Sequence, residues 1–286
     1  MNPDVLLVTC AAFPDGDEDG PQLLAALQRV RLRAQWRAWD DASAPWSSTP
    51  AVLRAAWDYT LRRAEFLAWA RLVPRLFNPY DAVLWNSDKI YLHDLELAGV
   101  PVTPTAVVAP GDAYHPDKSW GEVVVKPSVG AGSRGVGRFD AVAAAAEHVR
   151  TLHGEGRTAL VQPYLSGVDT AGETALVYLD GRFSHAVRKG PMLPVGTAHG
   201  VDGYALFVPE NISPRDASAD EVAVGDSVVQ ELTRRFGPLL YARVDLLPGP
   251  DGPVVVEAEI TEPSLFLSFA DGAVDRFAAA LARRLA

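Results

Sequence analysis

The stretch VVVKPSVGAGSRGVG, residues 123–137, constrains the fold of this chain more than any other. A β-branched run ends at Lys126 and Pro127, and four glycines follow within ten residues. The next segment, GVGRFD, is typical of a second strand, whereas the loop G-x-x-x-x-G-K-[ST] is followed by a helix. The pattern predicts a hairpin whose glycine-rich tip could cover a phosphate with N–H groups, with Lys126 adding a charge. A flexible loop with a solvated lysine is equally consistent with this stretch alone.

Composition excludes several classes of protein. The 286 residues are 48% hydrophobic and 22% charged, which is ordinary for a globular chain of two or three lobes. The net charge of −10 disfavours loose binding to nucleic acid or anionic membranes. Cys10 is the only cysteine, so an intrachain disulfide and a cysteine-based zinc site are excluded. Without a basic leader or an apolar run of about 20 residues, the sequence predicts a cytoplasmic protein.

Alternating strand and helix patterns indicate an α/β fold. Strands are expected at 5–10, 32–39 and 49–59, with helices beginning near Pro21 and covering 61–73, which favours an open α/β lobe over residues 1–85. A helix from Ser87 or Asp88 to Ala98 would open a second unit. We expect domains at 1–85, 86–160 and 161–286, and a polar insertion at 191–205 that covers a cleft.

Three carboxylates near the C-terminus form the second informative pattern. Asp245 lies on one predicted strand, and Glu257 and Glu259 lie on the next, joined to it through the turn GPDG. Residues two apart on a strand share a face, and the surrounding VVVEAEI is otherwise apolar. Buried carboxylates side by side repel, so a cation is expected between them, and Mg²⁺ prefers such hard oxygen ligands. The alternative is an exposed edge strand with alternating polar residues.

Together, the strand lysine, the glycine-rich flap and the late D…E-x-E hairpin resemble the ATP-grasp superfamily, of the glutathione synthetase and D-alanine–D-alanine ligase type. The resemblance covers about residues 86–270. It implies an α/β pre-ATP-grasp domain at 1–85, a small lobe with the flap at 86–160, and a C-terminal lobe with a metal site at 161–286. QPYLSGVDTAGETALVYLDGRFSHAVRKG and EITEPSLFL are more narrowly similar to the O-ureido-serine cyclo-ligases of cycloserine biosynthesis and their relatives, a group too broad to specify the substrate.

The resemblance implies roles for particular residues. It implies that ATP is bound by residues of both lobes and of the flap: Lys89, Lys126, Ser128, Gly132, Ser133, Gln162, Tyr164, Leu165, Asp169, Glu173 and Lys189. Asp169 and Glu173 compete for the ribose. Arg188, Lys126 and Arg243 would stabilise the transferred phosphoryl group. Asp245, Glu257 and Glu259 would hold magnesium, with two ions expected; Glu259 departs from the asparagine more usual at its position.

The implied reaction is an ATP-dependent carboxylate–amine ligation through an acyl phosphate, releasing ADP and phosphate. The substrate would be a small amino-acid-like carboxylate or amine, and ring closure within one molecule in natural-product biosynthesis is one option. Arg54 could hold a carboxylate, Asp58 an amine, and Ser264 could orient the acceptor; a solvated strand end beside a packed Trp57 is the alternative for the first two. A regulatory ATP-binding module and a small-molecule kinase are the rival functions. The oligomeric state is open, with a homodimer among the options.

Overall fold

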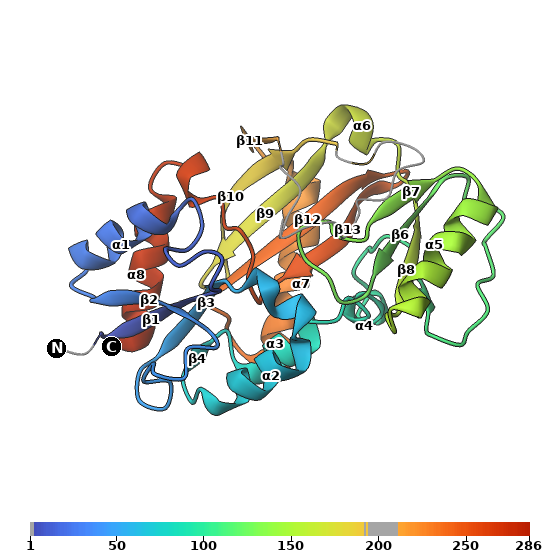
Figure 1. Ribbon diagram of the computed structural model, residues 1–286. Helices are drawn as coiled ribbons and strands as arrows, with labels where there is room; N and C mark the ends of the chain where they lie inside the picture. The colour runs from blue at the N-terminus through green and yellow to red at the C-terminus, as the bar shows by residue number, and fades with distance from the viewer. Residues whose placement is uncertain (1–2, 192, 194–210) are drawn as a thin grey trace.

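The computed structural model describes residues 3–191, 193 and 211–286, and it has a mixed α/β fold built on three sheets (Figure 1). The expected insertion at 191–205 lies outside these residues apart from Pro191 and Leu193. No helix in the described part of the chain is both long enough and apolar enough to cross a membrane.

The N-terminal lobe is a parallel sheet in the order β2-β1-β3-β4. Its strands are β1 (Val5–Thr9), β2 (Ala34–Ala38), β3 (Ala51–Ala55) and β4 (Leu76–Phe77), and its helices are α1 (Gly20–Arg29), α2 (Arg63–Leu72) and α3 (Tyr80–Asn86). Strands β1 and β3 are buried throughout, as expected for parallel strands covered on both faces. The third expected strand ends at Ala55, and the chain continues as the 3₁₀ turn η1 (Trp57–Leu61).

A second sheet carries the glycine-rich hairpin. Its antiparallel order is β5-β8-β6-β7, from strands β5 (Ala106–Val108), β6 (Val123–Pro127), β7 (Gly137–Phe139) and β8 (Ala159–Pro163), with helix α5 (Val142–Gly154) packed against it. Val123 pairs with Phe139 and Val125 with Gly137, so the expected hairpin is confirmed. The helix expected at 87–98 starts later, as α4 (Tyr91–Leu97), which leaves Lys89 in the turn after α3.

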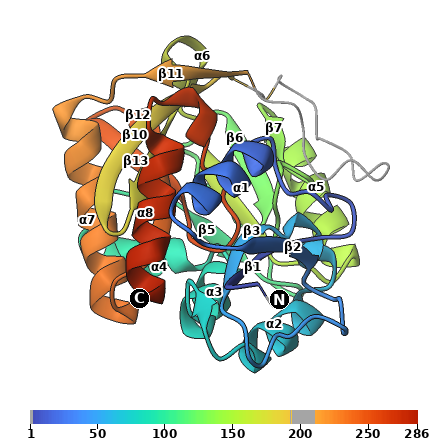
Figure 2. The same cartoon turned by 90° about the vertical axis from the view of Figure 1, so that its left-hand side faces the viewer.

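The central sheet is antiparallel, in the order β11-β10-β9-β12-β13. Its strands are β9 (Glu173–Leu179), β10 (Arg182–Lys189), β11 (Ile212–Arg215), β12 (Tyr241–Gly249) and β13 (Gly252–Glu259), preceded by the short helix α6 (Val168–Ala171). Helix α7 (Ala219–Phe236), which begins at a capping box of Ser218 and Glu221, packs against this sheet. After the turn η2 (Leu267–Phe269), helix α8 (Ala273–Leu285) lies beside α1 (Figure 2).

The last helix therefore completes the first lobe. A single core cluster joins Leu7 and Leu27 to Tyr241 and Phe277, from opposite ends of the chain. The division into three domains at residues 85 and 160 stays a prediction. Both boundaries fall inside an element, since α3 continues to Asn86 and β8 continues to Pro163.

A buried asparagine joins the first lobe to the central sheet. The side chain of Asn78, 1% exposed, donates to the carbonyls of Tyr241 and Ile260 and accepts from the N–H of Leu240, at 2.8–2.9 Å. We expect Asn78→Ala to lower the free energy of unfolding by about 3 kcal/mol, because three main-chain groups lose their partner in a buried interface. Urea denaturation of this variant and of the exposed control Gln28→Ala measures the loss; equal stability of the two variants would contradict the prediction.

Candidate active site

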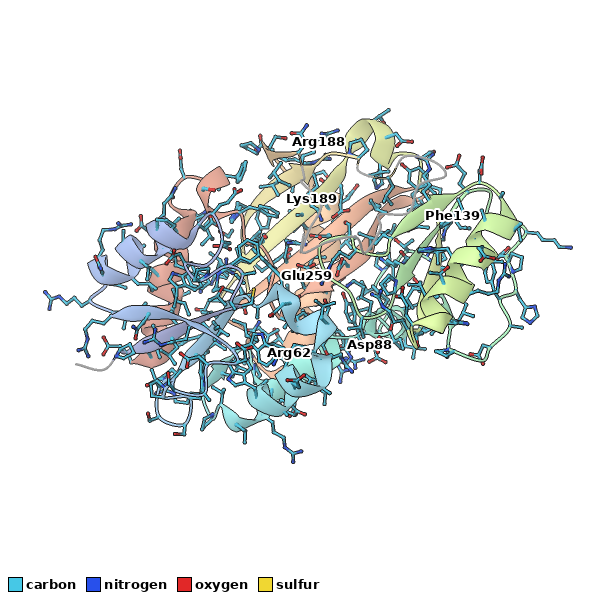
Figure 3. The ribbon with its side chains drawn as sticks, viewed as in Figure 1. Arg62, Asp88, Phe139, Arg188, Lys189 and Glu259 are labelled. Carbon is cyan, nitrogen blue, oxygen red and sulfur yellow. The ribbon has the colours of Figure 1, made fainter. Side chains whose placement is uncertain are left out.

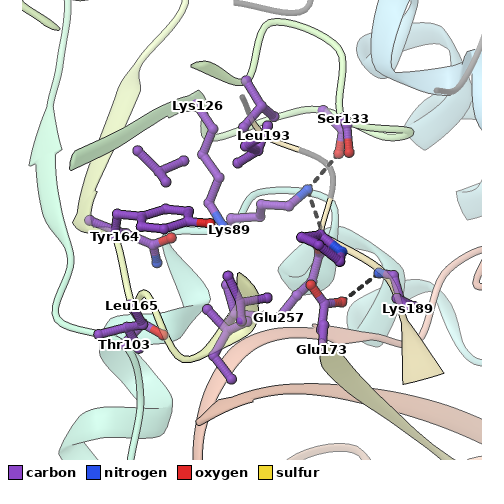
Figure 4. Close-up of a pocket in the computed structure, with 18 of the residues that line it drawn as sticks. Lys89, Thr103, Lys126, Ser133, Tyr164, Leu165, Glu173, Lys189, Leu193 and Glu257 are labelled. Carbon is purple, nitrogen blue, oxygen red and sulfur yellow. Dashed lines mark hydrogen bonds and ion pairs between the residues drawn. The ribbon is translucent and has the colours of Figure 1, made fainter. Parts of the chain in front are cut away.

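Two cavities meet at the centre of the molecule. The first lies between the hairpin sheet and the central sheet and is lined by residues including Lys126, Gln162 and Glu173 (Figure 4). The second is lined by the loop before α1, by Trp57 of η1 and by the segment that follows β13. The cavities share a wall, formed by the flap residues Ala131, Gly132 and Ser133 together with Lys189, Glu257 and Glu259.

The three carboxylates predicted from the sequence come together here: Glu257 and Glu259 belong to the shared wall, and Asp245, 1% exposed, is buried next to them. Asp245 of β12 is directly opposite Glu257 of β13, and one oxygen of each of Asp245, Glu257 and Glu259 lies within 4.8 Å of the others. Burial would raise the pKa of Asp245, but the Arg243 guanidinium and the Lys189 ammonium, at 2.8 and 3.1 Å, hold it well below its usual range. The hard oxygen donors fit magnesium.

The two glutamates differ in their electrostatics. Burial would raise the pKa of Glu257, but Lys89, at 2.9 Å, and Lys126 lower it below the usual value. Burial raises the pKa of Glu259 to about 8, because the charges of Glu257 and Asp245 add to the effect and Arg243, at 2.9 Å, only partly offsets it. Glu259 is therefore the carboxylate of the group whose charge the neighbouring cations stabilise least, and a metal ion beside it would lower its pKa.

Both predicted lysines reach the first cavity. Lys89 comes from the turn after α3, pairs with Glu257 and donates to the carbonyl of Gly130 in the flap. Burial would lower the pKa of Lys89, but Glu257 raises it above the usual value. Lys126, 7% exposed on β6, is different: burial lowers its pKa to about 8. One permanent and one titrating cation thus face the same space.

The pKa of Lys126 predicts a pH dependence of nucleotide binding. Below about pH 8 the ammonium is protonated and attracts phosphate, and as the pH rises through 8 it becomes neutral. We expect the affinity for ATP, measured by calorimetry in EDTA so that metal does not contribute, to fall between pH 7 and 9.5. Lys126→Arg should flatten this profile, because a guanidinium stays charged. An equally steep profile in that variant would assign the titration to another group.

The residues predicted for the base and ribose fall into two groups. Gln162, Tyr164, Leu165 and Glu173 line the first cavity, with Glu173 bound to Lys189 at 2.5 Å. Asp169 is absent from its lining in the described residues and instead accepts a hydrogen bond from the Tyr164 hydroxyl. Gly132 and Ser133 belong to the shared wall, whereas Ser128 is buried behind it, where its carbonyl accepts from the N–H of Lys89.

This placement favours Glu173 over Asp169 as the ribose partner. We expect Glu173→Gln to weaken ATP binding several-fold while leaving the affinity for 2′-deoxy-ATP nearly unchanged, because only ATP offers the hydroxyl that a carboxylate accepts strongly. Asp169→Asn serves as the matched control and should weaken neither nucleotide. Titration calorimetry of both nucleotides checks this, and the reverse pattern would assign the ribose to Asp169.

The structure does not bring Arg188 to the cleft. Successive side chains of a strand point to opposite faces, so Arg188 and Lys189 of β10 diverge (Figure 3). Arg188 donates to the carbonyls of Ala171 and Thr170 at the end of α6, at 2.8 and 3.3 Å. Lys189 lines both cavities and contacts Asp245. In the described part of the chain, the cations of the central sheet that line a cavity are therefore Lys189 and Arg243 rather than Arg188.

Of the three predicted substrate residues, only Ser264 lines a cavity. Arg54 is fully buried and donates to Asp17 at 2.7 Å and to the carbonyl of Pro263 at 3.2 Å. Asp58 lies in η1, outside the lining of both cavities as far as the chain is described, and accepts from the indole N–H of Trp39 at 2.8 Å. Arg54 lies within β3, whereas Asp58 follows its end at Ala55.

The sequence reasoning missed most of the second cavity. Its lining includes the loop residues Phe13 and Asp17, the indole of Trp57, and Glu262. Glu262 is 7% exposed, and burial raises its pKa well above the usual value, with Glu259 adding to the rise. The signal in the sequence is the segment EITEPS, in which Glu262 follows Glu259 by three residues.

Comparison with solved structures identifies the class of fold. The D-alanine–D-alanine ligase from Bacillus anthracis complexed with ATP matches with a TM-score of 0.68 at 13% identity, over 99% of this chain and 97% of that one. The ATP-grasp ligase PsnB, complexed with minimal precursor, Mg and ADP, matches with a TM-score of 0.64 at 16% identity, over 100% of this chain and 99% of the other. Both likenesses show that this chain has the ATP-grasp fold.

More similar proteins narrow the assignment. The model of the N-terminal domain of D-cycloserine synthetase DcsG matches residues 5–78. The cycloserine biosynthesis protein DcsG of Streptomyces lavendulae is 41% identical over 98% of both chains. The crystal structure of D-cycloserine synthetase DcsG matches with a TM-score of 0.87 at 38% identity, over 99% of each chain. This chain belongs to the DcsG family, which confirms the resemblance seen in the sequence.

Proposed function

We propose that this ligase phosphorylates the carboxylate of an amino-acid-like substrate of the O-ureido-serine type and closes an amide ring within that molecule, as an enzyme of antibiotic biosynthesis. The observation that carries the proposal is the carboxylate group Asp245, Glu257 and Glu259, of which Glu257 and Glu259 line both cavities. A nucleotide in the first cavity and a carboxylate in the second would meet at this group. The name of the cycloserine relative supports the substrate class.

The reaction has two steps. A carboxylate oxygen attacks the γ-phosphorus of ATP, the bond to the β–γ bridging oxygen breaks, and ADP leaves. The substrate nitrogen then attacks the acyl carbon, the bond from carbon to the phosphate oxygen breaks, and the nitrogen releases a proton to solvent. Such chemistry depends on positioning and charge neutralisation rather than on a side-chain nucleophile.

The residues have separate tasks in these steps. Lys89 and Lys126 offset phosphate charge from the side of the hairpin sheet, and Lys189 and Arg243 do so from the central sheet. Closure of the flap around Ala131, Gly132 and Ser133 over the phosphates would exclude water and so protect an acyl phosphate from hydrolysis. When bound at the three carboxylates, magnesium, which we propose as two ions, would neutralise the β- and γ-phosphates.

The experiment is ADP and phosphate release from MgATP across amino acids, dipeptides and O-ureido-serine, with product masses measured in the same samples. The substrate that responds is then labelled with ¹⁸O in its carboxylate. Transfer of one labelled oxygen to the released phosphate is expected for an acyl phosphate. A stable phosphorylated product would show a kinase instead, and tight MgATP binding without release on any compound would favour a regulatory module.

A further inference from the structure

The second cavity is strongly acidic among its described residues. Its lining includes six carboxyl side chains and two cationic ones: Asp17, Glu18, Asp19, Glu257, Glu259 and Glu262 against Lys189 and Arg243. Carboxylates crowded into one enclosed space repel, so each buried one needs a specific partner. The partners of these six side chains differ, and the differences show where a ligand of opposite charge belongs.

Five of the six are accounted for by the protein or by the proposed metal. Glu257 and Glu259 belong to the carboxylate group of the shared wall. Asp17 pairs with the buried Arg54, and Asp19 accepts from the main-chain N–H groups of Leu267 and Ser268 at 2.8 and 2.9 Å. These contacts fix the acidic loop against the central sheet. Glu18 is exposed and therefore solvated.

Glu262 is the exception. Its side chain lines the cavity and is 7% exposed, yet it forms no ion pair with any described residue. Lys89, whose charge lowers the pKa of Glu262, is already paired with Glu257. A hydrogen bond with Tyr59 favours the ionised form of the Glu262 side chain. The indole of Trp57 donates to the main-chain carbonyl of Glu262 at 2.9 Å. The turn η1 thus holds a buried carboxyl that has no counter-charge.

A carboxylate oxygen of another residue that lines the same cavity, Asp17, is buried and has no hydrogen-bond donor among the described residues. The Oδ1 atom of Asp17 accepts no hydrogen bond from the described part of the chain, although Oδ2 is bound by Arg54. The two cations that line the cavity in the described part of the chain, Lys189 and Arg243, both contact Asp245. The cavity therefore offers acids that can accept from a further donor as well as two cations, which suits a ligand with both charges.

We propose that Glu262 binds the α-ammonium group of the substrate, and that the second cavity selects zwitterionic amino acids whose carboxylate points to Arg243 and Lys189 beside the metal-binding carboxylates. The orientation of the substrate carboxylate in this assignment rests on the proposed function. It replaces Asp58 as the amine partner and makes Arg54 a positioning residue that holds Asp17. Burial makes the pairing strong, because an ammonium removes an uncompensated buried acid.

The test compares O-ureido-serine with the same compound lacking its α-amino group. Affinities are measured by calorimetry on the full chain in the presence of magnesium and a non-hydrolysable ATP analogue. We expect the wild type to prefer the amine by at least about 10-fold, since a site built for a polar group rejects the analogue that lacks it. Glu262→Gln should reduce that preference to near unity with unchanged affinity for the ATP analogue. Glu18→Gln, the same change at the exposed acid of the cavity, should retain it.

Three results would overturn the assignment: no binding of either compound, equal binding of both by the wild type, or an unchanged preference in Glu262→Gln. If that variant does not fold, Glu262→Asp keeps the charge and should retain part of the preference. ADP release from MgATP in parallel samples separates the two proposals. A clear preference for the amine without ADP release would refute the proposed function and leave the ammonium site standing.

Discussion

Replacing Glu257 by Gln is expected to lower kcat by at least about 10³-fold, the order found when a group that stabilises transition-state charge is removed. Glu257 contacts Lys89, a cation of the first cavity, and it also faces the second cavity. Its loss would remove a metal ligand and leave the buried ammonium groups of Lys89 and Lys126 without their main counter-charge. Steady-state ADP release with saturating MgATP measures the effect.

The control for this variant must separate chemistry from folding. Glu96→Gln makes the same chemical change on the exposed surface of α4 and should behave as the wild type. Magnesium dependence gives a second check, because a lost ligand should raise the magnesium concentration needed for half-maximal activity. Turnover within three-fold of the wild type at the same magnesium concentration would show that Glu257 does not hold the catalytic metal.

Replacing Lys126 by Ala is expected to weaken ATP binding and to lower kcat/KM by about 10²- to 10³-fold, because a buried point charge beside the phosphates is lost. Burial at 7% exposure makes this charge worth more than one at the surface. The measurements are calorimetry with ATP and initial rates of ADP release. Lys126→Arg should recover part of the affinity, since it keeps the charge but not the shape.

The matched control is Lys118→Ala, the same truncation at an exposed lysine of the hairpin sheet's loop. It should leave both measurements unchanged. Because removing Lys126 also relieves the repulsion it exerts on its neighbour Lys89, the variant should fold as well as the wild type. A normal ATP affinity in a folded Lys126→Ala protein would place the phosphates elsewhere in the cavity.

Much of the site was predictable because it depends on periodicity within single hairpins. Glu257 and Glu259 share a face because side chains of a strand alternate, and the turn GPDG brings Asp245 opposite Glu257. The glycine-rich hairpin follows from two β-branched strands with glycines between them. The narrower family followed from long segments such as TAGET and FSHAVRKG, and the comparisons confirmed it.

Other features required the tertiary structure, because they depend on where a strand ends and on which distant segments meet. The alternation along β10 takes Arg188 out of the cleft and puts Lys189 into it, a difference of one residue that a motif does not resolve. Asp58, expected at a strand end that faces the cleft, lies in η1 after β3 ends at Ala55. Arg54, expected to bind substrate, is instead buried and paired with Asp17, which is remote in sequence.

The sequence by itself determined the two hairpins, the grouping of three carboxylates, the two lysines and the family, since all of these depend on local patterns of side-chain type. The tertiary structure decided which face each charge occupies and which charges are already paired. Glu262 shows the difference: its sequence context identifies only an acid after a strand. Its lack of a counter-charge appears once η1, the acidic loop and the central sheet enclose one cavity. Pairing over long sequence distances is a property of the packed chain, and a local pattern carries no information about it.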